Sequence, residues 1–378
     1  MEGGVCGVHE DPWGLRASMS VRRRGDGSGG MTTSDTGLDR HPLSLSLPTR
    51  SGLSGTELTV LACAAEGVGV DTVFVAERVA DALTVCQQML AQTKTLKVGT
   101  AVVNARLRHP VLTAMTAMTM AASSGGRFLL GLGTANAHLN EWSLGLEPVS
   151  PLAWMAEYVA VIRQVLHGDS IRFRGRYFQI HDLVLDRPEP EGFPIFLGAL
   201  QPGMLRLAGA VADGVMLNLR SVEAIPAALS HLLSPAAQRD QRLGDLDVAC
   251  VIPCCVSDDV ELARDAARHA VLDYMLHPAA AQLFDAELEP GHLGRVQEAL
   301  LAGERQRASA MLTDEFVDSL VVSGSPTHCA RQIHRYREIG IPMPVAFPRP
   351  VGSDWATPVW EMVEAYQLGV SAKEPATT

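Results

Sequence analysis

Several features that would fix a function class are missing from this sequence. No run of about 18 apolar residues occurs, so we expect no membrane-spanning helix. The seven cysteines are odd in number and scattered without CxxC spacing, which favours reduced thiols in a cytoplasmic protein over a disulfide framework. Acidic residues outnumber basic ones and give a net charge of -11, which argues against a nucleic-acid-binding surface.

The first 40 residues differ in composition from the rest of the chain. They are rich in Gly, Ser and Thr, contain the run Arg22–Arg24, and show no apolar periodicity. No continuous apolar segment follows the arginines, as a secretory signal would require. We therefore expect a disordered leader over residues 1–40 and one folded domain over residues 41–370.

The folded part alternates between short apolar, β-branched segments and longer helical ones. The organising unit is a predicted strand at 97–103, a helix that begins at Pro110, and a second strand at 127–133 that ends on glycines. Eight such strands are expected in all, at residues 43–47, 70–76, 97–103, 127–133, 193–198, 214–218, 246–256 and 341–347. Nearly every strand is followed by a helix. This pattern predicts a (β/α)8 TIM barrel with insertions near residues 134–192 and 258–320.

Three strand ends carry residues suited to binding a ligand, because the carboxyl ends of barrel strands face the active site. Glu77 and Arg78 follow the second strand, where an exposed ion pair would also explain them. The sequence Gly131-Leu-Gly133-Thr134-Ala-Asn136 ends another strand, and its glycines would admit a flat cofactor or simply form a turn. Gly198 to Gly203 open a helix whose free N–H groups suit a phosphate, although an ordinary turn has the same pattern.

Other catalytic signatures are missing from the expected barrel. The twelve histidines show neither HxH nor HExxH spacing, so we expect no metal site. His109 precedes Pro110, and we interpret it as a structural cap at the start of a helix. No GxSxG elbow or nucleophile triad occurs either. A barrel without metal ligands or a nucleophile is expected to obtain its chemistry from an organic cofactor.

Six segments, in this order, resemble the bacterial luciferase-like monooxygenase family, particularly its branch that uses the deazaflavin coenzyme F420. They are VDTVFVAER, LKVGTAVVNARLRHP, SGGRFLLGLGT, GRYFQIHDLVL, PIFLGALQPGMLRLAGAVADGVMLN and VVSGSPTHCARQIHRYREIGI. The resemblance covers about residues 41–348. It implies a (β/α)8 barrel, usually dimeric, that holds coenzyme F420 or FMN at the carboxyl ends of its strands.

The resemblance also implies roles for individual residues. Glu77 and Arg78 fall beside the cofactor ring, and Ala101-Val102 fall where many members have a non-proline cis peptide behind the ring. Asn104, Gly133 and Thr134 complete the expected ring site. The cofactor phosphate is expected on Gly198, Ala199, Leu200, Gln201, Pro202, Gly203 and Met204.

The chain departs from the family pattern at three places. Asn136 stands where some dehydrogenases of the family have a glutamate proton donor, and an amide cannot donate a proton in that way. Arg78 stands where a histidine is common, and a guanidinium is a poor general base. Leu200-Gln201 replace the paired glycines that are frequent in the phosphate loop.

These observations predict an oxidoreductase that transfers hydride between C5 of coenzyme F420 and a small organic substrate. Arg78 and Asn136 are the candidate catalytic residues, expected to contact the substrate. We expect a homodimer with no nucleic-acid or membrane partner. Two alternatives stay open: an FMN-dependent two-component monooxygenase, and a non-catalytic protein that binds a flavin or deazaflavin.

Overall fold

Eight parallel strands form a closed ring in the computed structural model. β12 pairs with both β1 and β10, and β10 also pairs with β9, so the ring closes. The expected (β/α)8 barrel is therefore confirmed, with all eight expected strands present. In ring order the strands are β1 (Ser44–Ser46), β2 (Thr72–Val75), β3 (Lys97–Thr100), β5 (Phe128–Gly133), β8 (Ile195–Gly198), β9 (Gly214–Asn218), β10 (Asp247–Val256) and β12 (Met343–Pro348).

The structure describes most of the predicted domain. The described residues are 42–47, 53–78, 80–167, 170–185, 192–234, 239, 243–285, 288–352 and 356–368. The predicted leader, residues 1–40, lies outside them. Within these ranges, no helix is both long enough and apolar enough to cross a lipid bilayer.

The barrel interior is filled by side chains that alternate along the strands with side chains facing the helices. In β2, Phe74 belongs to the interior cluster, whereas Val73 and Val75 belong to the large core between the sheet and the helices. Ala101, Val102 and Phe347 pack against the interior cluster. The buried interior residues are Phe74, Leu129, Phe196, Met216, Ala249, Val251 and Val345.

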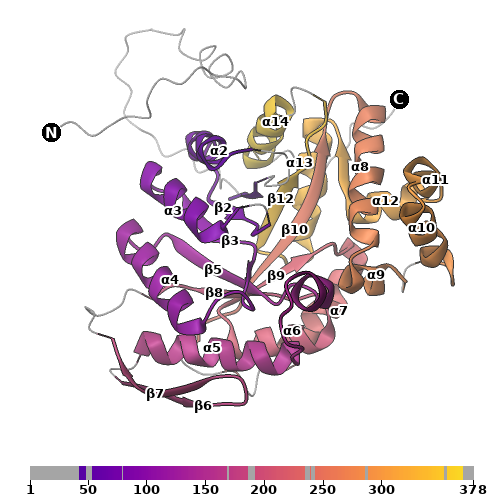
Figure 1. Ribbon diagram of the computed structural model, residues 1–378. Helices are drawn as coiled ribbons and strands as arrows, with labels where there is room; N and C mark the ends of the chain where they lie inside the picture. The colour runs from indigo at the N-terminus through magenta and orange to yellow at the C-terminus, as the bar shows by residue number, and fades with distance from the viewer. Residues whose placement is uncertain are drawn as a thin grey trace, which may run out of the picture.

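Helices connect the strands and cover the outside of the ring (Figure 1). Their starts follow local rules: Ser54 and Glu57 form a capping box, and Pro110 and Pro326 occupy first turns, where no N–H partner is needed. The helices are α2 (Gly55–Gly67), α3 (Ala82–Gln92), α4 (Pro110–Ser124), α5 (Pro151–His167), α6 (Pro202–Val211), α7 (Ile225–Leu233), α8 (Val260–Met275), α13 (Pro326–Glu338) and α14 (Ala356–Gln367).

Two insertions interrupt this alternation where the sequence predicts them. The first holds the π-helix η2 (His138–Ser143) and an antiparallel hairpin of β6 (Ser170–Arg174) and β7 (Gln179–Val184), which lies beside α5 at the lower edge of Figure 1. The second is helical and has its own apolar core. It comprises α9 (Pro278–Asp285), α10 (His292–Leu301), α11 (Arg305–Ala310) and α12 (Asp314–Leu320).

The structure differs from the sequence-based expectation in a few elements. The strand expected over 97–103 stops at Thr100 and resumes as β4 (Val103–Asn104), because the chain bulges between them. β11 (Val322–Gly324), η3 (Val222–Ala224), α7 and α14 were not expected. β11 is too short for a periodic pattern, and α7 carries a proline that its first turn tolerates.

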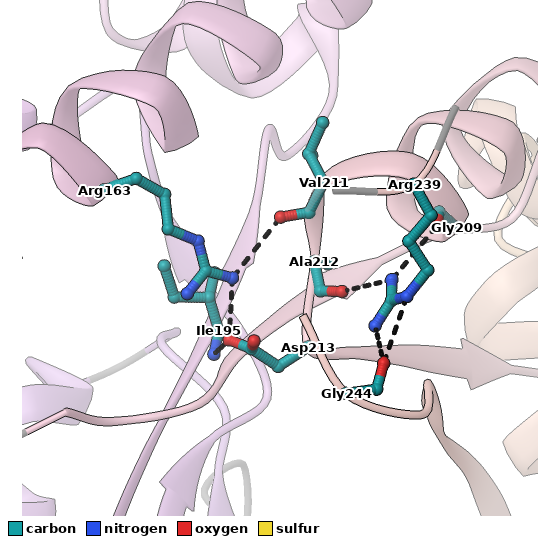
Figure 2. Close-up of polar contacts among 8 residues, drawn as sticks. All are labelled: Arg163, Ile195, Gly209, Val211, Ala212, Asp213, Arg239 and Gly244. Atoms are coloured by element: carbon teal, nitrogen blue, oxygen red, sulfur yellow. Dashed lines mark hydrogen bonds and ion pairs between the residues drawn. The ribbon is translucent and has the colours of Figure 1, made fainter. Parts of the chain in front are cut away.

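Paired polar groups close the amino-terminal side of β8 and β9 (Figure 2). Arg163 of α5 donates to the Asp213 carboxylate at 2.7 Å, and the same carboxylate oxygen accepts the backbone N–H of Ile195 at 2.7 Å. A second guanidinium, that of Arg239, donates to three carbonyl oxygens, those of Gly209, Ala212 and Gly244. Polar groups at this side therefore bind one another, as expected of the face of a barrel that serves stability.

Arg127 has a similar structural role at the start of β5. Its guanidinium donates to the carbonyl oxygens of Leu90, Thr93 and Leu96, at 2.7 to 3.1 Å, and its Nε donates to the carbonyl oxygen of Ser124 at 2.9 Å. These carbonyls end α3 and α4 or lie just before β3, and carbonyls at helix ends lack partners within the helix. Arg127 therefore ties two helix ends to the barrel.

Candidate functional site

A bulge between β3 and β4 organises the carboxyl end of the barrel. The peptide bond between Ala101 and Val102 is cis, at the position that the resemblance implies. The bulge places the Val102 side chain over the ends of β5 and β8. A Cβ atom at Gly133 would lie 2.5 Å from a methyl group of Val102, and one at Gly198 would lie 3.3 Å from the other. These two glycines thus make room for the bulge.

Gly131 is required by a close approach between two strands. A Cβ atom there would lie 1.9 Å from the carbonyl oxygen of Thr100, which no side chain could accommodate. The hydroxyl of Thr100 donates to the Gly131 carbonyl at 2.8 Å and accepts its N–H at 2.9 Å. From the sequence, Gly131 and Gly133 could either make room for a cofactor or form a turn. The structure explains both glycines by their packing against Thr100 and Val102.

A chain of buried and partly buried hydrogen bonds joins four predicted or neighbouring residues at this end. The Glu77 carboxylate accepts the backbone N–H of Asn104 at 2.8 Å. The Asn104 side chain donates to Asn140 at 2.9 Å, and Asn140 donates to the carbonyl oxygen of Thr134 at 2.6 Å. Glu77, Asn104 and Thr134 are thus brought together as expected of one site. Asn140, 3% exposed, was missed, because nothing in its sequence surroundings distinguishes it from a loop residue.

The two candidate catalytic residues lie nearer the surface. The Asn136 side-chain oxygen accepts the N–H of Leu139 at 2.8 Å and so helps to start η2. Arg78 is exposed and lines a surface cavity of about 450 Å³ together with Glu77, Leu107 and Arg108. Neither Arg78 nor Asn136 takes part in the hydrogen-bond chain, but both lie at the same end of the barrel, and Arg78 shares its cavity with Glu77 of that chain. His109 is confirmed as a cap, since its Nδ1 accepts the N–H of Val111 at 3.3 Å.

The predicted phosphate loop, Gly198 to Met204, connects β8 to α6. Pro202 occupies the first turn of α6, and the N-cap residue Gln201 makes no side-chain capping hydrogen bond. A helix start of this kind presents backbone N–H groups and the positive end of the helix dipole. The guanidinium of Arg220 donates to the carbonyl oxygen of Leu200 and so adds a positive charge beside the loop.

Asn218 carries the clearest sign that this end receives a ligand. Met216 faces the barrel interior and Leu217 faces the helices, so alternation returns the Asn218 side chain to the interior at the last position of β9. Its side-chain oxygen is buried and has no hydrogen-bond partner among the described residues. Other buried side-chain atoms, such as Gln87 Oε1 and Trp360 Nε1, are in the same state, so it is the place of Asn218 at the barrel mouth, together with the missing partner, that indicates a ligand.

Shifted pKa values near the barrel belong to structural groups. Burial raises the pKa of the Cys250 and Cys255 thiols to about 12, so neither forms a nucleophilic thiolate near neutral pH. Burial also raises the pKa of Tyr158 to about 12, despite a 2.6 Å hydrogen bond with Thr113. Among the described residues, no three His, Cys, Asp or Glu side chains gather as a metal site would require. The arrangement suits binding of an organic molecule with a flat part and a polar chain.

Comparisons with known proteins agree with this geometry. A family model described as luciferase-like monooxygenase matches residues 40–342. A 5,10-methylenetetrahydromethanopterin reductase of Archaeoglobus fulgidus is 29% identical over 267 residues, covering 70% of this chain and 80% of that protein. An F420-dependent glucose-6-phosphate dehydrogenase of Nakamurella multipartita is 29% identical over 306 residues, covering 75% and 84%. The coenzyme F420 dependent tetrahydromethanopterin reductase from Methanopyrus kandleri has the same fold, with a TM-score of 0.73 at 20% identity, covering 86% of this chain and 98% of that one.

Proposed function

The chain belongs to the luciferase-like monooxygenase family, and we propose that it is an oxidoreductase that uses coenzyme F420. The observation that carries the proposal is the buried, unpaired oxygen of Asn218 at the carboxyl end of β9. A buried acceptor without a hydrogen-bond partner destabilises the folded protein unless a ligand supplies the donor. Relatives that match over most of their length and whose names include F420 support this coenzyme as the source of that donor.

The residues at the barrel mouth fit such a cofactor. Val102 on its bulge offers an apolar surface to a flat ring, and the network around Glu77 and Asn104 holds the bulge in place. The start of α6 would receive the phosphate, with Arg220 beside it. Asn218 would accept a hydrogen bond from a ribityl hydroxyl or from the ring N–H.

The proposed reaction is hydride transfer to or from a small organic substrate. When bound, the deazaflavin supplies a ring carbon, C5, that gives or takes the hydride. The protein orients the substrate against the ring, and Arg78 and Asn136 are its proposed polar contacts. The residues give no general acid at position 136, so a substrate that needs proton transfer there would obtain it from another group.

A binding titration tests the proposal. Purified full-length protein is titrated separately with oxidised F420 and with FMN at a fixed, moderate salt concentration. Micromolar binding of F420 together with much weaker binding of FMN is the expected result. Tight binding of FMN alone would replace the proposal with the FMN-dependent monooxygenase. Binding of F420 without turnover in a broad screen of alcohols, imines and activated alkenes would favour the non-catalytic binding protein.

We also propose that the chain forms a homodimer through the face that includes the start of α4. Leu107, Leu112 and Met115 are 50%, 51% and 42% exposed, and large apolar side chains gathered on one surface are typical of an interface. Light scattering with size-exclusion chromatography measures the oligomeric state. The wild type is expected to be a dimer, and L112E with M115E to be a monomer. A monomeric wild type would contradict the proposal.

A further inference from the structure

A second cavity lies between α8 and the segment that follows β12. Its volume is about 350 Å³, and it is lined by one face of α8 and by residues 347–352. The residues of α8 that line it recur every three to four positions, from Leu262 to Ala270, so they form one stripe of the helix. A cavity of this size is in the range that holds small organic ligands.

The polar part of this cavity, which we call the α8 cavity, is formed by Arg349, His269 and Asp265. Arg349 and Arg305 both pair with Asp273, each on a different carboxylate oxygen. The Asp273 carboxylate is therefore shared between two guanidinium groups, and that of Arg349 lines the cavity. The Arg349 side chain is 18% exposed and lies over the ring of Phe347, with 5.7 Å between the guanidinium carbon and the ring centre. A guanidinium held rigidly at a partly buried wall suits recognition of a carboxylate or phosphate.

His269 adds a hydrogen-bond donor to the same wall. Its Nδ1 accepts from Nε of Arg305 at 3.0 Å, and because a guanidinium only donates, the proton of the neutral ring must be on Nε2. The nearest carboxylate to Nε2 is that of Asp265 at 3.7 Å, which is too long for a hydrogen bond. Asp265 also lines the cavity, but its side chain is 63% exposed, so solvent screens its charge.

The remaining walls are apolar and reach the barrel mouth. Leu262, Ala266 and Val351 line the cavity. Phe347, which also lines it, packs against the interior cluster of the barrel with Val102. The α8 cavity thus combines apolar walls with convergent polar groups at one end, which is the usual composition of a small-molecule site.

We propose that the α8 cavity binds a small organic anion. Its acidic group pairs with Arg349 and accepts from Nε2 of His269, and its apolar body packs against Leu262, Ala266 and Val351. The proposal does not depend on the cofactor, because none of these residues belongs to the predicted F420 site. A carboxylate and a phosphate share the chemistry required, and the experiment separates them.

The experiment measures binding of benzoate, phenyl phosphate and neutral benzyl alcohol to full-length protein by ligand-observed NMR. Benzoate or phenyl phosphate is expected to bind at millimolar concentration, and benzyl alcohol about tenfold more weakly, since only the anions pair with Arg349. The stronger of the two anions identifies the acidic group. Benzyl alcohol binding as tightly as both anions, or no saturable binding of either anion, would overturn the proposal.

Two variants and a control locate the site. R349M removes the cation, and A266F fills the cavity without changing a charge, so each is expected to weaken anion binding about tenfold or more. R172M serves as the matched control, because Arg172 forms an exposed ion pair with Asp182 on the distant β6–β7 hairpin. Equal anion binding in wild type and A266F would refute the location, even if R349M failed to fold. F420 affinity, measured on the same variants, is expected not to change.

Discussion

Replacing Asn218 by leucine tests the proposed cofactor site with two effects of opposite sign. Asn218 ends β9 inside the barrel mouth, opposite Val251 of β10, and its buried side-chain oxygen has no partner among the described residues. Leucine has nearly the same shape without a polar atom. We expect N218L to make the apo protein more stable and to weaken binding of F420.

The two magnitudes follow from the state of that oxygen. An unpaired buried acceptor costs about 1–3 kcal/mol, so its removal is expected to raise the free energy of unfolding by a similar amount. For a chain of this size, that gain raises Tm by roughly 2 °C per kcal/mol. A neutral hydrogen bond to the cofactor contributes about 0.5–1.5 kcal/mol, so its loss is expected to weaken F420 binding by about two- to tenfold.

The assay combines thermal unfolding of the apo protein with a fluorescence titration of oxidised F420. M216L is the matched control, since Met216 faces the same interior two residues earlier and the exchange conserves volume. The control should leave F420 affinity unchanged. If N218L lowered Tm and left F420 affinity intact, then Asn218 would be a structural residue, and the argument for ligand binding at β9 would fail.

Three further predictions concern the framework. D213N is expected to lower the free energy of unfolding, measured in urea, by about 2–3 kcal/mol. This is less than for a fully buried pair, because the side chains of Arg163 and Asp213 are 21% and 25% exposed. The F420 affinity of this variant is expected to stay unchanged. Burial raises the pKa of Glu66, but hydrogen bonds from residues 94–96 outweigh it and hold the pKa below its usual value. Glu66 therefore contributes fully to stability above its unfolded-state pKa of about 4.3, and this contribution is lost as the pH falls through its lower pKa in the folded state. Urea midpoints of the wild type should show this loss, whereas those of E66Q should not. G133A is expected to cost about 1–3 kcal/mol by colliding with Val102, and the double variant G133A/V102A should recover stability in thermal unfolding if the collision is the cause.

The barrel could be predicted because its strands are short, apolar and regularly followed by helices. The bulge at Ala101-Val102 could not be predicted from local pattern, since residues 97–103 read as one uninterrupted strand. Only the family resemblance indicated it. The glycines of β5 were recognised as special, but their reason lies in contacts with Thr100 and Val102, which come from a different strand and become visible only in three dimensions.

The candidate site could be predicted in part for the same reason. Glu77, Asn104 and Thr134 were expected from strand ends and resemblance, and the structure links them through hydrogen bonds. Asn140, which completes that link, has no signal in the sequence. Asn218 does have a signal in the sequence, because it is a polar residue at the last position of an otherwise apolar barrel strand, where the side chain faces the interior.

Two of the motifs that identify the family, SGGRF and ADG, lie at the end of the barrel opposite to the proposed substrate contacts. Arg127 of SGGRF and Asp213 of ADG both form hydrogen bonds with backbone groups at the amino-terminal side of the strands. Their presence therefore indicates that the chain has the barrel scaffold of the family. The three departures from the family pattern, Arg78, Asn136 and Leu200-Gln201, all follow the carboxyl ends of strands. Since a scaffold contact and a substrate contact at opposite ends can vary independently, agreement in these two motifs supports the fold but carries no information on the substrate. The substrate must therefore be sought by assays of variants at Arg78 and Asn136, the proposed substrate contacts, rather than taken from the names of relatives.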